Sequence, residues 1–406
     1  MPPIDTGDTA FMLLSAALVL FMTPGLALFY AGMGRSKNVL SITMQSFFAM
    51  GIVSVLWALL GYTLAFGNDV GGVIGSLEFI GLKGVAGSVY AGYPTIPHSV
   101  WVMYQGMFAI ITPALITGAF AERMKFKAYA VFIAFWTILV YSPLAHWVWG
   151  GGWLMKLGAL DFAGGTVVHI ASAAAALAAA IAVGRRKDLG KPDLQPHNLP
   201  MTLLGAGILW FGWFGFNAGS AVAANHVAGA AFMATHLAAA CGMLGWIGME
   251  WWQHGKPTTL GAASGAVAGL VGITPAAGFV DALPAMAIGL TVGVLCYFGV
   301  KLKSRFGYDD ALDVVGVHGV GGTTGALLTG VFAGVVTNPT YRGLIAGNAA
   351  QLWPQVVGVV ATIVFSFTVS FVLLKVIDKV IGLRVDEEAE ERGLDLADHA
   401  ETGYVL

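Results

Sequence analysis

Charge is scarce in this chain. Only 10% of its 406 residues are Asp, Glu, Lys or Arg, whereas 57% are hydrophobic. Because a soluble globular protein carries roughly a quarter charged residues, this composition indicates a polytopic membrane protein. The formal net charge of −2 gives no reason to expect a nucleic-acid partner.

Cysteines and a basic leader are also lacking. The two cysteines, Cys241 and Cys296, lie inside apolar runs, so we interpret them as free thiols rather than as a disulfide framework. The first ten residues, MPPIDTGDTA, contain two aspartates and no Lys or Arg, unlike the positive region that opens a signal peptide. We therefore expect the run from residue 11 onward to be the first true membrane span.

The sequence shows no nucleophile–base pair and no set of metal ligands. Two lone histidines, His169 and His318, lie in apolar runs, and neither has further Cys, His or carboxylate ligands at helical i+3 or i+4 spacing. We therefore expect no enzymatic activity, no metal and no other cofactor.

Apolar runs between charged or Gly/Pro/Asn breaks predict an all-α fold of eleven transmembrane helices. They lie near residues 10–32, 42–66, 98–120, 127–149, 162–184, 199–220, 226–248, 258–276, 283–301, 313–336 and 350–381. The fifth, eighth and tenth are rich in Gly and Ala, so a strict hydropathy threshold would miss them. The eleventh, at about 48 Å, exceeds the ~30 Å hydrocarbon core, and we expect it to tilt and cross the bundle like a strap.

Basic residues fall on one side of this arrangement. All of the 20 Lys and Arg residues except Lys83, Lys156 and Arg342 lie in loops or span ends that the eleven spans place on the same side. The positive-inside bias then predicts an extracellular or periplasmic N-terminus and a cytoplasmic C-terminus, in a plasma or inner membrane. Residues 1–382 would form the membrane domain, and residues 383–406 a soluble acidic tail with a short helix ending near Gly393.

An odd number of spans permits two inverted five-helix repeats plus the eleventh helix. The segment FYAG at residues 29–32 ends span 1, and the similar FNAG at residues 216–219 ends span 6. Inverted repeats commonly place a substrate site near the bilayer midplane. On that arrangement, His169 and His318 would face one another.

Each of these histidines follows a carboxylate, Asp161 before His169 and Asp313 before His318. A lone intramembrane histidine is often only a hydrogen-bonded core residue, but an ionisable group at that depth also marks a pathway. The pair of histidines favours a narrow polar section in an otherwise apolar pore, because neutral imidazoles form hydrogen bonds with small polar solutes and can pass protons. Asp161 and Asp313 are each interpreted as helix caps, and Asp161 also adds negative potential at the outer side.

Aromatic residues gather at the predicted outer ends of several spans. Phe216 and Ser220 lie in GWFGFNAGS at the outer end of span 6, Phe108 lies at the outer end of span 3, and Trp149 lies at the outer end of span 4. Aromatic faces converging on one mouth hold a small cation, at ~0.5–2 kcal/mol each. An interfacial aromatic belt accounts for the same residues equally well. Composition favours neither interpretation.

Long motifs over essentially the whole chain resemble the ammonium transporter (Amt/Mep/Rh) family, in particular its bacterial and archaeal branch. They are LVLFMTPGLALFYAG, GALDFAGGTVVHI, PHNLP, GWFGFNAGSA, GAVAGLVGITPAAGFV, DVVGVHGVGG and the tail segments GLRV and GLDL. The resemblance implies a homotrimer of eleven-helix protomers embedded in lipid, each with its own conduction path. It also implies that the tail supports docking of a cytoplasmic PII signal-transduction protein.

The resemblance also suggests roles for single residues. Phe108 and Phe216 would form a stacked gate, and Trp149 and Ser220 an outer ammonium recruitment site. Tyr104 stands at the same vestibule, where the family often has Phe. The family's acidic residue, structural to the site and implicated in ammonium deprotonation, corresponds to Asp161. The twin histidines of the pore correspond to His169 and His318.

These roles predict electrogenic ammonium transport. Ammonium would be recruited at the mouth and deprotonated, NH₃ would pass the gate, and the proton would follow separately along the histidines. Carrying an ion through a dry apolar pore is expensive, whereas a neutral amine with a few hydrogen bonds crosses more easily. The alternatives are an electroneutral NH₃ gas channel and an ammonium sensor that signals through its tail.

Overall fold

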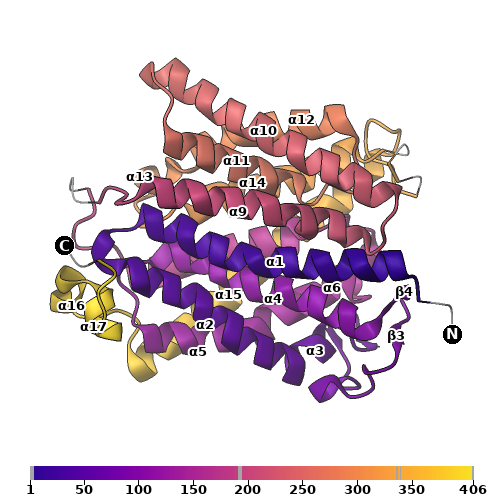
Figure 1. The fold of residues 1–406 in the computed structure, drawn as a ribbon, viewed down its shortest axis with the longest axis horizontal. Helices are drawn as coiled ribbons and strands as arrows, with labels where there is room; N and C mark the ends of the chain where they lie inside the picture. Colours follow the sequence, from indigo (N-terminus) through magenta and orange to yellow (C-terminus); the bar gives the residue numbers. More distant parts are fainter. Residues whose placement is uncertain (1–3, 191–193, 335–336, 339, 405–406) are drawn as a thin grey trace.

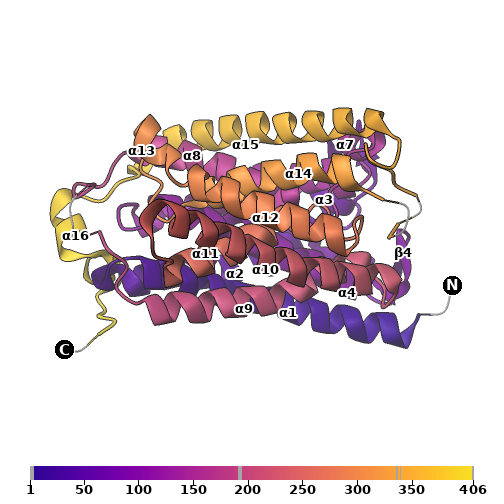
Figure 2. The ribbon, with the colours of Figure 1, turned by 90° about the horizontal axis from the view of Figure 1, so that it is seen from above.

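The structure, a computed structural model, describes residues 4–190, 194–334, 337–338 and 340–404. It is a bundle of long helices that run along one common axis (Figure 1). The first helix begins at one end of the bundle, and the chain's last helices lie at the other end (Figures 1 and 2). We call these ends the N-terminal face and the tail face.

The first half of the chain supplies five helical segments. They are α1 (Thr6–Met33), α2 (Val39–Leu56) with the π-helical turn η2 (Trp57–Gly61) and α3 (Tyr62–Phe66), α4 (His98–Phe120), α5 (Phe126–Trp136) with the π-helical turn η4 (Thr137–Tyr141) and α6 (Ser142–Trp149), and the π-helical turn η5 (Gly165–Ile170) with α8 (Ala171–Val183).

The second half supplies five more segments and a final long helix. They are α9 (Leu199–Ala218), α10 (His226–His254), α11 (Thr259–Ile273), α12 (Ala282–Gly299), the π-helical turn η7 (Val315–Gly319) with α14 (Val320–Phe332), and α15 (Leu352–Ile381). Each of the eleven predicted spans coincides with one of these segments, so the eleven-helix fold is confirmed.

Short elements connect the long helices. Two antiparallel strand pairs, β1 (Asp69–Val70) with β2 (Ile74–Gly75) and β3 (Val89–Tyr90) with β4 (Tyr93–Pro97), lie between α3 and α4. The remaining connecting elements are η1 (Ser36–Asn38), η3 (Ile80–Leu82), α7 (Trp153–Leu157), η6 (Gly219–Ala221), α13 (Leu302–Phe306) and η8 (Ala349–Gln351).

Length and hydropathy alone identify nine membrane-spanning helices in the described part of the chain. The segments that this criterion misses are the eighth and tenth, α11 and η7–α14, as their Gly/Ala-rich sequences suggested; the fifth passes it. The tenth segment ends at Phe332, whereas residues 335–336 of the predicted span lie outside the described residues.

Glycines allow the first helices of the two halves, α1 and α9, to pack backbone to backbone. A Cβ atom on Gly205 would lie 2.3 Å from the Phe29 nitrogen, and one on Gly25 would lie 2.6 Å from Ile208 Cγ2. No real side chain tolerates such distances, so the small residues are a packing requirement of this contact.

Corresponding helices of the two halves make corresponding contacts. The pairs α1–α4, α2–α4 and α4–α8 recur as α9–α11, α10–α11 and α11–α14. This recurrence supports the two repeats, while their inverted relation stays a prediction. Helix α15 runs along the outside of the bundle (Figure 2) and contacts α5, α8 and α14, so it bridges both halves as expected of a strap. Its tilt in a bilayer stays a prediction.

The acidic tail folds onto the tail face rather than extending into solvent. Helix α16 (Glu387–Arg392) ends at Gly393 as predicted, and a second short helix, α17 (Leu394–His399), follows it unexpectedly. The Asp395 carboxylate accepts the backbone N–H groups of Leu40 (3.1 Å) and Ser41 (2.8 Å) near the start of α2. Burial raises the pKa of Asp395 despite these bonds.

Candidate transport site

A vestibule of about 320 Å³ lies toward the N-terminal face. It brings together four residues that the sequence predicted for the site, namely Phe108, Trp149, Asp161 and Ser220. The Trp149 indole donates to the Asp161 carbonyl oxygen at 2.8 Å, which fixes the orientation of the ring. Sequence reasoning missed other residues that line the vestibule, among them Tyr93, Trp101, Gln105, Phe279 and Tyr341.

The rings of Phe108 and Phe216 close the vestibule from below. Their centroids are 4.2 Å apart and their planes 23° from parallel, and both residues are buried. Phe108 lines the vestibule and Phe216 lines the chamber beyond it, so the stacked pair separates the two spaces. One of the rings must move before a molecule can pass between them.

Tyr104 lies behind this pair and does not line the vestibule. Its hydroxyl lies 3.0 Å from the Gly215 carbonyl oxygen, 2.9 Å from that of Phe216 and 3.2 Å from Ser220 Oγ. Ser220 Oγ in turn donates to the Phe216 carbonyl at 2.9 Å. The geometry therefore makes Tyr104 a support for Phe216 and Ser220, with no face of its own on the vestibule.

The Asp161 carboxylate caps the π-helical turn that carries His169. Its Oδ1 accepts the N–H groups of Gly164 (2.8 Å) and Gly165 (2.6 Å). Its Oδ2 accepts those of Thr166 (2.7 Å) and Val167 (3.3 Å), together with the Thr166 hydroxyl. A carboxylate offers about four lone-pair positions, and five donors occupy them. Asp161 therefore has no free lone pair for a substrate proton in this structure, and the cap interpretation is the one that its contacts support.

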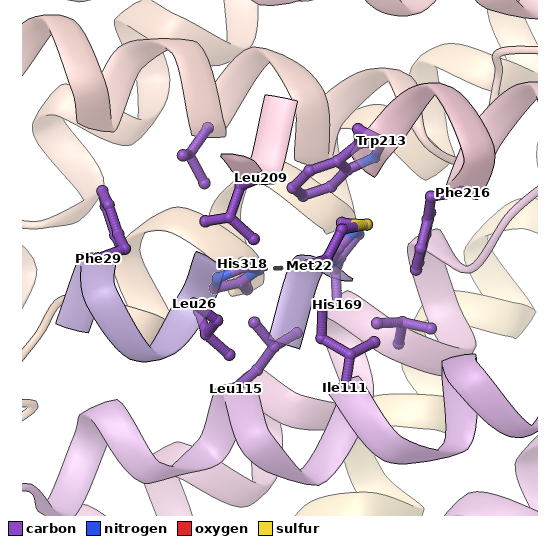
Figure 3. Close-up of a pocket in the computed structure, with 12 residues that line it drawn as sticks. Met22, Leu26, Phe29, Ile111, Leu115, His169, Leu209, Trp213, Phe216 and His318 are labelled. Atoms are coloured by element: carbon purple, nitrogen blue, oxygen red, sulfur yellow. Dashed lines mark hydrogen bonds between the residues drawn. The ribbon is translucent and has the colours of Figure 1, made fainter. Parts of the chain in front are cut away.

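A narrow chamber of about 10 Å³ lies between Phe216 and Phe29 (Figure 3). The only ring nitrogens of its lining are those of His169, His318 and the Trp213 indole, and the other lining side chains are apolar: Met22, Leu26, Phe29, Ile111, Leu115, Val168, Leu209, Phe216 and Val267. One water needs about 10–15 Å³ of such volume. The chamber therefore has room for about one small molecule and none for a hydrated ion.

The two histidines meet in this chamber, as the repeat predicted. His169 lies on η5 and His318 on η7, their Nδ1 atoms are 3.2 Å apart, and both residues are buried. His169 is on the Phe216 side and His318 on the Phe29 side (Figure 3). The π-helical turns widen both helices locally at these positions, as such turns often do at functional sites.

Neighbouring hydrogen bonds decide which nitrogens of the pair carry protons. Thr274 donates its hydroxyl proton to the Leu270 carbonyl (2.8 Å) and accepts from the Trp213 indole (2.9 Å). His169 Nε2, 3.4 Å from Thr274 Oγ1, must then be the donor in their contact. Neutral His169 therefore accepts at Nδ1, and His318 donates from its own Nδ1. Thr274 and Trp213 were missed as site residues, although both lie in the quoted family motifs.

The prediction that Asp313 caps the second histidine helix is wrong. Asp310 makes the capping bond: its Oδ2 accepts the Val315 N–H at 2.7 Å. Asp313 has a positive φ of 63° and pairs with Lys303 at 2.7 Å. Asp310 precedes His318 by eight residues, the separation of Asp161 from His169. This equal spacing was the signal that could have identified it.

Buried charges join the loops at the tail face. Arg186 Nη2 lies 2.9 Å from Asp309 Oδ1, and Arg186 Nη1 lies 3.4 Å from Glu122 Oε2. The same Glu122 oxygen pairs with Arg35 Nε at 2.9 Å. Burial would raise the pKa of Asp309, but the hydrogen bonds from Arg186 and the charge of Arg123 outweigh it and hold that pKa below its ordinary value. The network joins loops from both halves of the chain.

An apolar helical bundle with a vestibule, an aromatic barrier and a chamber for one small polar molecule defines a multi-pass membrane transport protein. The family model described as Ammonium Transporter Family matches residues 10–404, and the chain belongs to that family. It is therefore a transporter and not an enzyme.

Individual relatives agree with this assignment over nearly the full length. The chain is 54% identical to an ammonium transporter of Bacillus subtilis over 99% of both chains. It is similar to the crystal structure of Candida albicans Mep2, with 36% identity and a TM-score of 0.91 over 99% of this chain and 94% of that one. A solved structure described as "Sensor Amt Protein" is 31% identical, with a TM-score of 0.90 over 97% of this chain and 98% of that one.

Proposed function

We propose that this ammonium transporter recruits NH₄⁺ in the vestibule and conducts NH₃ through the chamber, with the proton crossing separately so that one net charge moves. The observation that carries the proposal is the chamber of about 10 Å³, which is apolar apart from its imidazole and indole nitrogens. Burying an uncompensated charge costs far more than burying a hydrogen-bonded neutral molecule. The chamber's size and lining therefore favour NH₃ over NH₄⁺.

Recruitment is assigned to Trp149, Phe108 and Ser220. The Trp149 ring stands edge-on to Phe108, with centroids 6.1 Å apart, and Ser220 Oγ borders the same vestibule. Aromatic faces and a hydroxyl acceptor suit a small cation that has shed part of its water. At about 320 Å³, the vestibule also has room for water that could receive a proton.

Asp161 supports deprotonation indirectly on this proposal. Its carboxylate is occupied by the η5 cap, so it contributes negative potential and a rigid turn beside Trp149 and does not take the proton itself. The proton leaves to vestibule water and then crosses by way of His169 and His318, while NH₃ passes the Phe108/Phe216 barrier.

We propose that the protein lies in a plasma or inner membrane, with the N-terminal face outside and the tail face in the cytoplasm. The basic loops and the charge network on the tail face support this orientation. Assembly as a homotrimer and docking of a PII protein on the tail face, with residues 383–406 as a regulatory segment, are proposed from the family resemblance.

A sensor is the second candidate. The solved structure described as "Sensor Amt Protein" and the folded tail favour it. A sensor would change partner binding at its tail in response to ammonium even in a variant that conducts nothing.

The deciding experiment measures current from proteoliposomes on a solid-supported membrane after an ammonium pulse. We expect a saturable transient current with ammonium and none with sodium or potassium. A pH-reported NH₃ flux without current would establish an electroneutral gas channel instead. Ammonium-selective current that persists after both histidines are replaced by Leu would refute the proton route through the pair.

A further inference from the structure

A side chain of the strap helix α15 holds the backbone directly before Asp161. Gln355 is 2% exposed, and its Oε1 accepts the Leu160 N–H at 2.6 Å. Its Nε2 donates to the carbonyl oxygens of Leu160 at 2.9 Å and Ala326 at 2.8 Å. Only this orientation of the amide satisfies all three contacts, because an amide oxygen cannot donate and an amide nitrogen cannot accept.

The position of these bonds gives them their importance. Leu160 lines the vestibule, and the segment from Gly158 to Gly164 has no regular secondary structure to hold it. The next residue, Asp161, fixes Trp149 through its carbonyl and η5 through its carboxylate. The geometry of the recruitment site therefore depends on where the Leu160 peptide lies.

The third contact extends the connection to the other half of the protein. Ala326 is on α14, the helix that continues from the π-helical turn carrying His318. A single amide thus joins the strap, the turn that holds Asp161 and the second histidine helix. The side chain of Gln351, one turn earlier on η8, donates to the Gly158 carbonyl at 2.8 Å and reinforces the same turn.

We propose that Gln355 is a positioning residue for ammonium recruitment, acting through the Leu160–Asp161 backbone and not by contact with the substrate. This inference rests on the proposed recruitment role of the vestibule. A residue that only stabilises the fold would change thermal stability and leave the ammonium dependence of transport unaltered. A positioning residue changes the ammonium concentration that gives half-maximal transport.

The test compares Gln355→Met and Gln355→Glu with a matched control on the same helix. Met has a similar length but leaves both polar groups of Leu160 unpaired. We expect half-maximal current at about tenfold more ammonium, the size of effect that an unmade buried hydrogen bond produces, with the maximal current changed less than twofold. Glu keeps an acceptor for the Leu160 N–H. When ionised, however, it places a negative oxygen where the amide donated, next to the carbonyl oxygens of Leu160 and Ala326, which it repels.

Protonation of the introduced Glu restores a donor. Relative to wild type at each pH, Gln355→Glu should therefore approach normal half-saturation as the pH falls and depart from it as the pH rises. The control is Ser370→Ala, which removes another buried bond of α15, from the Trp136 indole to Ser370 Oγ at 2.9 Å, outside the vestibule lining. We expect it to lower thermal stability without moving half-saturation.

Unchanged half-saturation in folded Gln355→Met, or an equal shift in Ser370→Ala, would overturn the inference. If Gln355→Met does not fold, the pH dependence of Gln355→Glu decides, and a profile parallel to wild type refutes the role. A wild type that carries flux without current would instead refute the proposed charge movement. The same comparison would then be made on the pH change inside the vesicles.

Discussion

Replacing Asp161 with Asn tests whether the Asp161 carboxylate acts as a helix cap or as a proton acceptor. In the wild type, Oδ1 serves two backbone N–H groups, and Oδ2 serves two more and the Thr166 hydroxyl. The Asn oxygen can keep the first pair. Its NH₂ group, however, would point two N–H bonds at three donors.

The expected cost follows from these contacts. The backbone N–H groups of Thr166 and Val167 lose their acceptor inside the protein, at about 1–3 kcal/mol each, whereas the hydroxyl can turn elsewhere. Removing a negative charge from a helix N-terminus adds about 0.3–1 kcal/mol. Asp161→Asn should therefore destabilise the protein by about 2–7 kcal/mol. It should also lose transport, because η5 loses part of its cap and the Asp161 backbone, whose carbonyl orients Trp149, is no longer held in place by the carboxylate.

Thermal unfolding of detergent-solubilised protein, followed by intrinsic fluorescence, measures the first effect, and the proteoliposome current measures the second. Asp386→Asn is the control. Asp386 caps the tail helix α16 at an exposed site through one bond to the Ala389 N–H of 2.8 Å, so about 1 kcal/mol or less is expected. An Asp161→Asn protein as stable as wild type but without transport would refute this reasoning and make Asp161 a chemical participant.

Three further changes test other parts of the site. Tyr104→Phe removes the hydroxyl beside Ser220 and should raise half-saturating ammonium about threefold to fivefold, the effect of one net hydrogen bond, so an unchanged value in the current assay would contradict the support role. Thr274→Val removes the acceptor of His169 Nε2 and should lower maximal flux about tenfold, whereas Thr274→Ser should conduct normally; equal flux in both would argue against it. Asp309 has a lowered pKa, so its stabilising contribution is complete above the ordinary value of 3.8 and is lost as pH falls through the folded value. The difference in stability between wild type and Asp309→Asn, measured by thermal unfolding at a series of pH values, should therefore be largest at neutral pH and decrease below about pH 4. A stability difference that stays constant down to about pH 3 would contradict this role of Asp309.

The spans were predictable because their signal is local. Apolar runs and the side of each basic loop are read directly from the chain, so even the Gly-rich α11 and η7–α14 were placed correctly. The meeting of His169 and His318 followed from one further assumption, that the two halves repeat. The structure brings them to adjoining sites on η5 and η7.

Contacts that depend on loop geometry could not be read in the same way. Asp313 is nearer His318 than Asp310 is, and sequence proximity favoured it, but its positive φ turns it toward Lys303. Gln355 gave no signal, because its partners are backbone atoms that carry no sequence identity. The docking of the tail through Asp395 likewise depends on the N–H groups of Leu40 and Ser41.

The proton arrangement of the histidine pair has a consequence for turnover. On the proposed proton route, a proton that hops from the vestibule side to the tail side would enter at His169 Nε2, displace the shared proton onto His318 Nδ1 and leave from His318 Nε2. The pair then holds its protons on the nitrogens that the bonds of Thr274 assign to them here. Both rings must return to the opposite tautomer before a second proton can follow. On the proposed proton route, the pair would thus act as a relay that is reset after each passage and not as a continuous proton wire, which would prevent it from dissipating the membrane's proton gradient.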